Sequence, residues 1–418
     1  MKLIPRKYRF LLTCAVCAAV AVLLGACSSG ASSSTGAASG DSASAASSPG
    51  NSGAVKSAAT GSPIKIMVIS VRSTPELVAP QVWSGADARA DAINAAGGIN
   101  GHPIDVIACD SNFDPNQEAA CLRTAVSDNV SAVVGSYILY GNLDILQKAK
   151  IPLVAPWGIA QFEYQSPVSY PFGSELSWYL GMATIAKEDG LKTVKLEGVN
   201  TAAAAEADTL ISGALQQEGI KDIGNVTSNI DGTDFTADAA LLMQGNPGGI
   251  ILGGLVPNIF PKIVTDLRQA GYTGKLITIS PFTDPTTLAS LGSMADGLQV
   301  SLDAWPVTAT NQPVVQEYLS EMQEYAKGAK EDEFSEFGWS GVDVFANVMK
   351  SATSYTAASV TAAFSALANP VEAGVFGPFV GTGTSPVATW PRGFNHEFIN
   401  ATVKNGIVVP IGTWQTAG

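Results

Sequence analysis

Only two histidines, His102 and His396, occur among the 418 residues, and they lie far apart in the sequence. Two such distant histidines disfavour both a histidine-rich metal site and a Ser-His-Asp triad. The chain also lacks the GxSxG, HExxH, GxGxxG and phosphate-loop spacings that accompany common catalytic and nucleotide sites. The sequence predicts a protein that is not an enzyme and that carries no metal or cofactor.

Aromatic and amide side chains are instead concentrated just after apolar, strand-like runs. The residues concerned are Tyr137, Tyr140, Asn142, Trp157, Asn200 and Phe282. Aromatic side chains at the mouth of a cleft can stack on a ligand. Each of them could equally pack in a core or between two lobes, and the sequence leaves that alternative open.

The elements that would position these residues alternate regularly from Pro63 onward. We expect strands at 64–70, 104–109, 131–135, 151–155, 192–198, 221–227, 249–253 and 275–279, and helices at 81–96, 115–128, 142–149, 175–188, 203–218, 235–244 and 258–270. This alternation implies parallel sheets covered by helices on both faces. A loop rich in proline and aromatic residues, 167–172, divides the series, so the predicted fold is α/β with two doubly wound lobes. Ligands of such sheets bind outside the carboxyl ends of the strands.

The composition is that of a globular domain and restricts its partners. Hydrophobic residues make up 46% of the chain and charged residues 14%, which is typical of a folded protein. Residues 63–418 carry 18 basic and 35 acidic side chains. A surface this negative repels phosphate backbones, so we expect no nucleic-acid partner.

The N-terminus has the pattern of an export signal. A basic stretch, Lys2 to Arg9, precedes an apolar run from Phe10 to Ala26. The run ends in Leu24-Gly25-Ala26-Cys27, which resembles the lipobox of bacterial lipoproteins, whose cysteine is acylated. We therefore expect a signal peptide over 1–27 and a lipid-anchored protein on the extracytoplasmic face of a bacterial membrane. An ordinary signal peptide cleaved nearby is the alternative.

The next segment, 28–62, contains 13 Ser, 9 Ala and 6 Gly among its 35 residues. Such a composition favours a flexible coil, so the segment is interpreted as a tether. Of the five cysteines, two lie within the signal and Cys27 would carry the lipid, which leaves Cys109 and Cys121. Because exported proteins meet oxidising conditions, we predict a disulfide between these two; a pair of reduced, buried thiols is the alternative.

Four further segments of the chain occur in a characteristic order: Gly97–Ile104 (GGINGHPI), Cys109–Asn116 (CDSNFDPN), Val133–Ser136 (VVGS) and Ile151–Pro156 (IPLVAP). Together they resemble successive blocks of the leucine/isoleucine/valine-binding proteins, the type I periplasmic solute receptors of ABC importers. Weaker similarities continue to about Thr413, so the resemblance covers nearly all of the globular part. The ordered combination is specific, although each block alone is weak.

The resemblance implies two lobes joined by a three-crossover hinge, with crossovers near 172–175, 302–305 and 378–383. The first lobe would comprise 63–174 and 304–378, and the second 175–303 and 379–418. Ligand binding would close the lobes by hinge motion, and ABC permease subunits would recognise the closed form of a monomer. Carried over by position, the ligand contacts would be Ser136, Tyr137, Tyr140, Gly141, Asn142, Pro156, Trp157 and Gly158 in the first lobe, and Asn200, Leu255 and Phe282 in the second.

The sequence departs from the pattern of the amino-acid binders in this family. Those proteins hold the α-carboxylate with a Ser/Thr-rich loop and the α-ammonium with an acidic residue after a second-lobe strand. Here segment 137–141 has few hydroxyls, and Phe282 stands at the acidic position. An unpaired buried ammonium is strongly disfavoured. We therefore expect a flat or apolar solute that stacks on Trp157, Tyr137 or Tyr140.

Polar groups of that solute would be fixed by Asn142, by Ser136 and by the backbone N–H groups at the start of helix 142–149. A two-residue shift in the alignment would instead bring Asp284 into the ammonium position and favour a branched-chain amino acid. A ligand-sensing receptor module that does not take part in transport is a further alternative.

Overall fold

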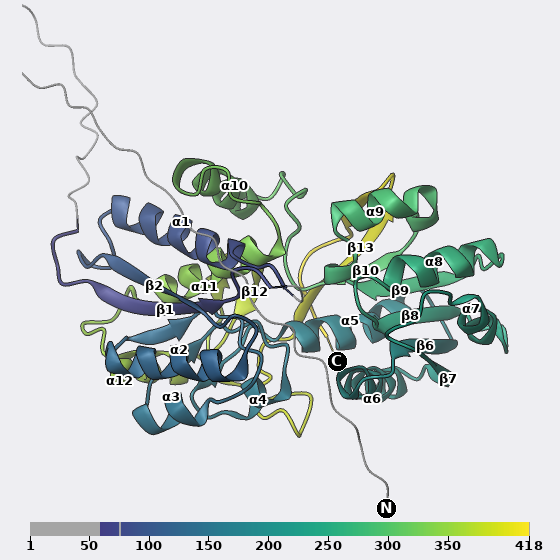
Figure 1. Ribbon diagram of the computed structural model, residues 1–418, viewed down its shortest axis with the longest axis horizontal. Helices are drawn as coiled ribbons and strands as arrows, with labels where there is room; N and C mark the ends of the chain where they lie inside the picture. Colours follow the sequence, from purple (N-terminus) through teal and green to yellow (C-terminus); the bar gives the residue numbers. More distant parts are fainter. Residues whose placement is uncertain (1–58, 75–76, 418) are drawn as a thin grey trace, which may run out of the picture. The chain divides into compact units, whose positions relative to one another are not determined.

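The computed structural model describes residues 59–74 and 77–417 (Figure 1). Its strands are β1 (Ile64–Ser70), β2 (Ile104–Asp110), β3 (Ala132–Val134), β4 (Leu153–Val154), β5 (Ser169–Tyr170), β6 (Thr193–Val199), β7 (Lys221–Ser228), β8 (Gly249–Gly254), β9 (Lys275–Ile279), β10 (Gln299–Leu302), β11 (Val371–Ala373), β12 (Phe376–Phe379), β13 (Glu397–Lys404), β14 (Ile407–Pro410) and β15 (Gln415–Thr416). The expected signal peptide, Cys27 and the tether up to residue 58 lie outside the described residues.

The helices are α1 (Gln81–Ala95), α2 (Pro115–Ser127), α3 (Asp144–Ala149), α4 (Gln161–Gln165), α5 (Ser174–Glu188), α6 (Ala202–Gln217), α7 (Thr236–Met243), α8 (Phe260–Gln269), α9 (Pro285–Leu291), α10 (Pro313–Tyr325), α11 (Glu333–Met349) and α12 (Ala357–Ser365), with 3₁₀ turns η1 (Ser280–Phe282) and η2 (Gly292–Ala295). Within the described residues, none of these helices combines the length and apolar character needed to span a bilayer. The helices and strands predicted from the sequence are present, with small shifts at their ends. Helix α4 and strand β5 were not predicted and lie in the segment between the predicted strand 151–155 and the predicted helix 175–188.

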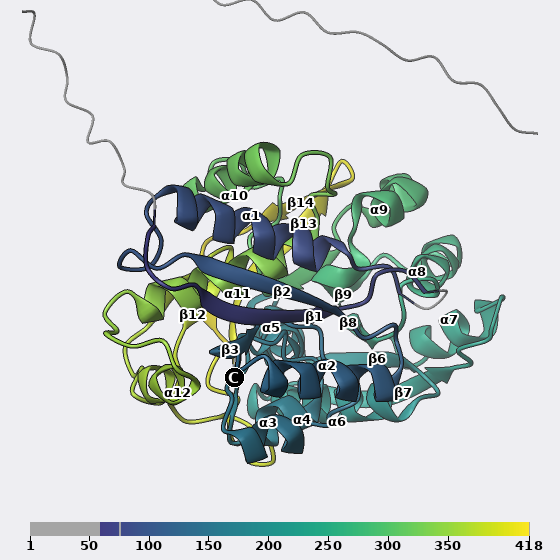
Figure 2. The ribbon, with the colours of Figure 1, turned by 60° about the vertical axis from the view of Figure 1, so that its left-hand side comes forward.

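The first lobe is built on a parallel sheet with strand order β2-β1-β3-β4-β5. Both faces of β1 are largely buried, whereas the edge strand β2 is mostly half-buried or exposed. Ile66 and Val68 of β1 belong to the core that includes α1, whereas Met67 and Ile69 belong to a second core with residues of α2 and α3. Figures 1 and 2 show α1 on one side of β1 and β2, and α2 on the other. Helices α10 and α11 also pack on α1, and α12 packs on α11.

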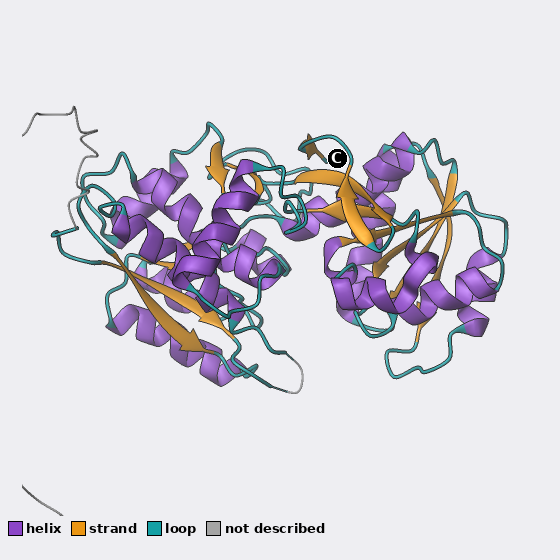
Figure 3. Ribbon diagram, turned by 90° about the horizontal axis from the view of Figure 1, so that it is seen from above, coloured by secondary structure: helices purple, strands orange, loops and turns teal. Residues whose placement is uncertain are grey.

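The second lobe has a sheet with strand order β14-β13-β10-β9-β8-β6-β7, flanked by helices (Figure 3). Strands β6 to β10 are parallel, as expected, but β13 is antiparallel to β10, β14 and β15. The reason is connectivity. Strand β10 ends where the chain leaves this lobe and β13 begins where it returns, so Leu302 pairs with Ile399 and the two strands run in opposite directions. The predicted parallel sheet is therefore a mixed one in this lobe.

The chain passes between the two sheets three times, through residues 171–173, 303–312 and 380–396. The proposed lobe boundaries, 174/175, 303/304 and 378/379, fall within or beside these connections. Much of the third connection packs on the first lobe: Trp390 stacks on Tyr164 with ring centroids 4.4 Å apart, and the Arg392 amide donates to the Tyr164 carbonyl.

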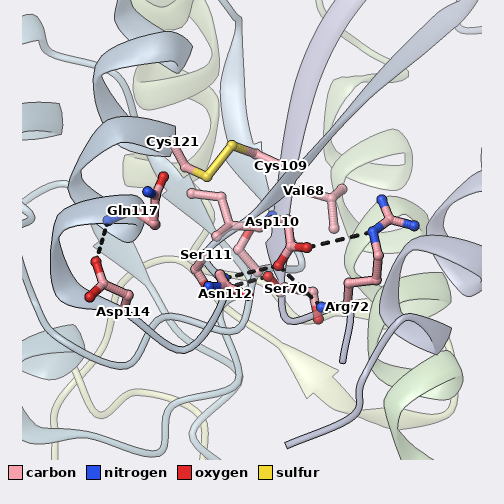
Figure 4. Close-up of a disulfide and its surroundings, with 12 residues drawn as sticks. Val68, Ser70, Arg72, Cys109, Asp110, Ser111, Asn112, Asp114, Gln117 and Cys121 are labelled. Atoms are coloured by element: carbon pink, nitrogen blue, oxygen red, sulfur yellow. Dashed lines mark hydrogen bonds and ion pairs between the residues drawn. A yellow bond between two sulfur atoms is a disulfide. The ribbon is translucent and has the colours of Figure 1, made fainter. Parts of the chain in front are cut away.

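A disulfide joins Cys109 at the end of β2 to Cys121 within α2, with 5.8 Å between the Cα atoms (Figure 4). The helix is placed for this pairing because Asp114 caps it, accepting from the amides of Asn116 and Gln117, and Pro115 occupies its first turn. A cross-link that closes so short a loop contributes about 3 kcal/mol in the chain-entropy account. The predicted pairing is present in the structure.

Candidate ligand-binding site

Two buried glutamates fix the loops that follow β3 and β4 at the carboxyl end of the first sheet. The Glu118 carboxylate accepts from the amides of Leu139 at 2.7 Å and Tyr140 at 3.1 Å. The Glu163 carboxylate accepts from the amides of Ile159 at 2.8 Å and Ala160 at 3.1 Å. The sequence analysis missed both residues. The sequence signal that could have identified them is a glutamate at a core-facing position of a helix, Glu118 in α2 and Glu163 in α4.

Burial perturbs both of these carboxyl groups. It raises the pKa of Glu118, while the loop amides act in the opposite direction. It raises the pKa of Glu163 to about 8, again against the amides, and the charge of Glu118 adds to the rise. The Glu163 Oε1 atom also has no hydrogen-bond partner. The anchor of the loop after β4 therefore changes protonation near neutral pH.

Several first-lobe residues expected to contact the ligand are bonded within their own lobe. Ser136 is fully buried; its Oγ accepts from the Ile69 amide at 2.9 Å and donates to the Val134 carbonyl at 3.1 Å. The Tyr140 hydroxyl donates to the Phe113 carbonyl, and the Asn142 amide donates to the Pro115 carbonyl. Helix α3 begins at Asp144 rather than at residue 142 and places this acidic side chain in its first turn.

Pro156, Gly158 and Gly141 shape the loops rather than offer polar groups. The Pro156 carbonyl accepts from the Phe172 amide, which ties the loop after β4 to the first crossover. Gly158 has a φ of 77°, and a Cβ there would lie 2.8 Å from the Gly173 nitrogen, so only glycine fits. Gly141 has a φ of 93° and turns the chain before α3.

Trp157 is the centre of an aromatic cluster and is only 4% exposed. Its ring stacks on Phe337, with centroids 4.9 Å apart, and meets Tyr137 and Phe334 edge-on at 5.6 and 5.2 Å. The ring of Trp178, from α5 of the second lobe, lies 6.4 Å away. The structure thus brings together the expected pair, Tyr137 and Trp157, and adds aromatic residues from α5 and α11.

A polar network adjoins these rings and links both lobes. Trp157 Nε1 donates to Asp303 Oδ2 at 3.3 Å, and Trp178 Nε1 donates to Ser280 Oγ at 2.9 Å. The same Ser280 Oγ lies 2.9 Å from Asp303 Oδ1 and 3.0 Å from Glu333 Oε1. We call Trp157, Trp178, Ser280, Asp303 and Glu333 the hinge cluster. Ser280 and Asp303 directly follow β9 and β10, which is the signal that could have revealed them.

The Ser280 hydroxyl lies between two carboxyl groups of the hinge cluster. A serine hydroxyl has one hydrogen and two lone pairs, and the Trp178 indole N–H occupies one lone pair of Ser280. Carboxyl oxygens of both Asp303 and Glu333 lie at hydrogen-bond distance from this hydroxyl. Burial, then the charge of Asp303, raises the pKa of Glu333 well above its ordinary value, while the hydrogen bond from Ser280 acts in the opposite direction. The single hydroxyl proton is therefore shared between two acceptors that lie close together.

The expected second-lobe contacts lie outside the hinge cluster. Asn200 is exposed, and its Oδ1 accepts from the Ile230 amide. Leu255 is a buried core residue, and Phe282, 4% exposed, stacks on Phe260 with centroids 5.3 Å apart. Asp284, the alternative acidic residue, caps α9 by accepting from the amides of Thr286 and Thr287.

Two cavities are found elsewhere. One of about 420 Å³ is lined by His102, Ser131 and Tyr355 among others, and one of about 400 Å³ by Asp234, Lys262 and Asp266 among others. Neither includes a hinge-cluster residue or an expected contact. Among the described residues, no group of three or more His, Cys, Asp or Glu side chains is arranged to hold a metal ion.

The two-lobed architecture and the three connections agree with a comparison to family models, in which residues 63–389 match the model described as periplasmic binding protein. The chain belongs to the periplasmic binding protein family. A curated relative of this periplasmic binding protein is an amino acid binding protein of Pseudomonas aeruginosa, 25% identical over 209 residues. The match spans 47% of the chain and 55% of that relative, or about half of its length.

Solved structures of the same fold cover most of this periplasmic binding protein. A putative branched-chain amino acid ABC transporter protein from Rhodospirillum rubrum superposes with a TM-score of 0.69 at 20% identity, covering 84% of this chain and 99% of the other. A solute-binding protein of an ABC transporter from R. palustris, in complex with 4-hydroxybenzoate, has a TM-score of 0.67 at 17% identity, covering 85% and 97%. A leucine binding protein from Thermotoga maritima has a TM-score of 0.63 at 18% identity, covering 84% and 99%.

Proposed function

We propose that this periplasmic binding protein is the solute receptor of an ABC importer of the branched-chain amino acid type and captures a small organic solute at the hinge cluster. One observation carries the proposal: Ser280 of the second lobe, Asp303 of the second crossover and Trp157 and Glu333 of the first lobe are joined in a single network. A ligand bound there contacts both lobes. It therefore favours the closed arrangement over the open one and gives a permease a signal to recognise.

The solute is not a simple zwitterionic amino acid. Phe282 stands at the position where the amino-acid receptors of the family carry the acidic partner of the ammonium, and its ring stacks on Phe260. The alternative acidic residue, Asp284, caps α9. Ser136 already uses its hydroxyl within the first lobe. Trp157 and Tyr137 supply ring surface instead, worth about 0.5–1.5 kcal/mol per aromatic contact beyond area burial. The 4-hydroxybenzoate complex of the R. palustris protein supports a flat ligand for this fold.

Binding, rather than catalysis, suits the hinge cluster. Among the described residues, the Ser280 hydroxyl is hydrogen-bonded to carboxyl groups and an indole, and to no histidine. The hydroxyl thus lacks the imidazole base of a Ser-His-Asp triad. A branched-chain amino acid receptor and a sensing module without transport are the alternatives. The first requires a zwitterion to bind, and the second would not deliver solute to a permease.

The protein acts as a lipid-anchored monomer outside the cytoplasmic membrane, with Cys27 as the acylated residue. The family match supports an extracytoplasmic location. In cells, Cys27→Ala should leave the chain unprocessed or release it from the membrane. Unchanged membrane retention of a correctly trimmed chain would contradict lipidation.

Binding to the full chain can be tested by a thermal-shift screen with amino acids, aromatic acids, short amides, polyols and amines, followed by calorimetry of each hit. The hinge-cluster assignment predicts that Asp303→Asn weakens binding at least tenfold, about 1.4 kcal/mol. Lys148→Met is the control, because its side chain is exposed and pairs with the exposed Asp144 on α3. A solute whose affinity is unaffected by Asp303→Asn and Trp157→Phe would overturn the assignment.

A further inference from the structure

Three carboxyl groups gather at the hinge cluster without a basic side chain. Asp303 and Glu336 are 2% and 3% exposed, and Glu333 lies one helical turn before Glu336 on α11. Within the part of the chain that the structure describes, no hydrogen bond or ion pair connects any of the three to a lysine or arginine. The neighbouring Lys330 pairs with Asp332, the residue that caps α11.

Glu336 is a buried carboxyl group that lacks a partner. Its Oε1 atom has no hydrogen-bond donor. The charges of Asp332 and Asp303 act on Glu336, and that of Glu336 acts on Glu333. Positions three apart on a helix share one face, which places Glu333 and Glu336 on the same side of α11. A buried polar atom that is unpaired within the chain is costly, and it can accept a donor from outside the chain, either a water molecule or a bound cation.

Ring surface adjoins the same carboxyl groups. Besides Trp157, the aromatic cluster includes the partly buried rings of Tyr137 and Phe334, whose centroids lie 5.9 Å apart. Burial raises the pKa of the Tyr137 phenol, and the charges of Glu163, Glu333 and Glu175 add to the rise. Aromatic faces combined with carboxylates are the surroundings in which proteins bind organic cations.

From this arrangement we infer that the solute is an organic amine cation without an α-carboxylate, its charged nitrogen held by Asp303, Glu333 and Glu336 and its apolar body packed on Trp157. The inference rests on the proposed function and names the solute class of that site. The ammonium donates to the carboxyl oxygens of Asp303 and Glu333 that surround Ser280, any proton carried by Glu333 is released to solvent, and the ammonium supplies the missing partner of Glu336. A second, anionic group on the solute would find no basic side chain bonded to these carboxyl groups. The acidic surface of the chain also attracts cations.

Calorimetry on the full chain with matched probes tests this inference. Benzylamine, cyclohexylamine and choline are the cationic probes, and benzyl alcohol, cyclohexanol and benzoate are their neutral or anionic counterparts. We expect at least one amine to bind at least about tenfold more tightly than its alcohol, and benzoate not to bind. Glu336→Gln should lower amine affinity at least about tenfold, because it keeps the shape and removes the carboxyl group that pairs with the ammonium. Glu331→Gln, at an exposed acidic position, is the control and should have no effect.

The outcomes separate the solute class from the site. If no amine binds, or if a neutral or anionic solute binds and loses affinity in Asp303→Asn, the cation assignment is wrong; in the second case the proposed site stands. If an amine binds with an affinity that Glu336→Gln, Asp303→Asn and Trp157→Phe leave unchanged, both the assignment and the site are wrong. Far-ultraviolet circular dichroism and the melting temperature of each variant identify any loss of binding caused by misfolding.

Discussion

The hydroxyl of Ser280 in the second lobe lies 3.0 Å from the Glu333 carboxyl group at the first turn of α11 in the first lobe. The same hydroxyl accepts the indole N–H of Trp178 and lies 2.9 Å from Asp303. One small side chain thus bonds to a helix of its own lobe, to a crossover and to the opposite lobe. Any solute that enters the hinge cluster must compete with these contacts.

Ser280→Ala should destabilise the protein by about 1–3 kcal/mol, because it leaves the Trp178 N–H and two carboxyl groups without their shared partner. Urea unfolding followed by tryptophan fluorescence measures the change. Ser290→Ala is the matched control, since the Ser290 hydroxyl bonds only to the Thr287 carbonyl on an exposed part of α9. Equal, small effects of the two substitutions would show that the Ser280 network contributes little to stability.

Stability should fall as the pH rises from about 4.5 to about 8. Burial raises the pKa of Glu163 and of Glu197 to about 8, so between the unfolded-state pKa and pH 8 the folded protein binds more protons than the unfolded chain. Since the free energy of unfolding then decreases with pH, the contribution of each group is present at acid pH and lost through pH 8. Glu163→Gln keeps an acceptor for the Ile159 amide and should flatten the curve. If the free energy of unfolding of Glu163→Gln fell with pH as steeply as that of the wild type, Glu163 would not be a source of the pH dependence.

The ion-pair network around Arg89 should be a main contributor to first-lobe stability. Its guanidinium lies 2.6 Å from Asp343 and 2.6 Å from Glu321, and it covers the Trp339 ring. Arg89→Met would leave buried carboxylates uncompensated and should cost about 3–5 kcal/mol. Lys148→Met breaks only an exposed pair and should cost about 1 kcal/mol or less. Thermal or urea unfolding of the two variants provides the comparison, and a loss in Arg89→Met no larger than in Lys148→Met would exclude the role.

Most elements of the fold could be predicted because their signals are local. Strand β2 ends at Asp110 and α2 begins at Pro115, where the capping residue Asp114 and the proline mark the boundary. The disulfide was predicted only from the expected export of the chain and from the even number of cysteines that remain. The direction of β13 could not be predicted in this way. It depends on where the chain returns from the first lobe, which no residue within the strand specifies.

The candidate site was also hard to predict, because its residues are brought together by the path of the chain between the lobes and not by local sequence. The sequence pointed to Trp157 and Tyr137, which do meet, but the carboxyl groups beside them come from a crossover and from the start of α11. Ser280, Asp303 and Glu333 are separated in the sequence and converge only through the topology. Carry-over by position also chose Ser136 and Asn142, whose polar groups are bonded within the first lobe.

Leucine, isoleucine and valine should not bind at micromolar concentration or below, because Phe282 offers no partner for an ammonium at the position used by amino-acid receptors of the family. Calorimetry with the three amino acids checks this directly. Tight binding that is weakened strongly by Asp284→Asn and little by Phe282→Ala would show that the alignment was shifted. The ordinary amino-acid function would then be correct.

The location of a bound solute tests the central claim most directly. A crystal structure of the full chain with the solute that gives the largest thermal shift would show which residues hold it. The account predicts a ligand in contact with the Trp157 ring and within hydrogen-bond distance of Asp303 or Glu333, with both lobes contributing contacts. A ligand held instead beside Phe282 and Asp284, with the Ser280–Glu333 contact intact, would contradict it.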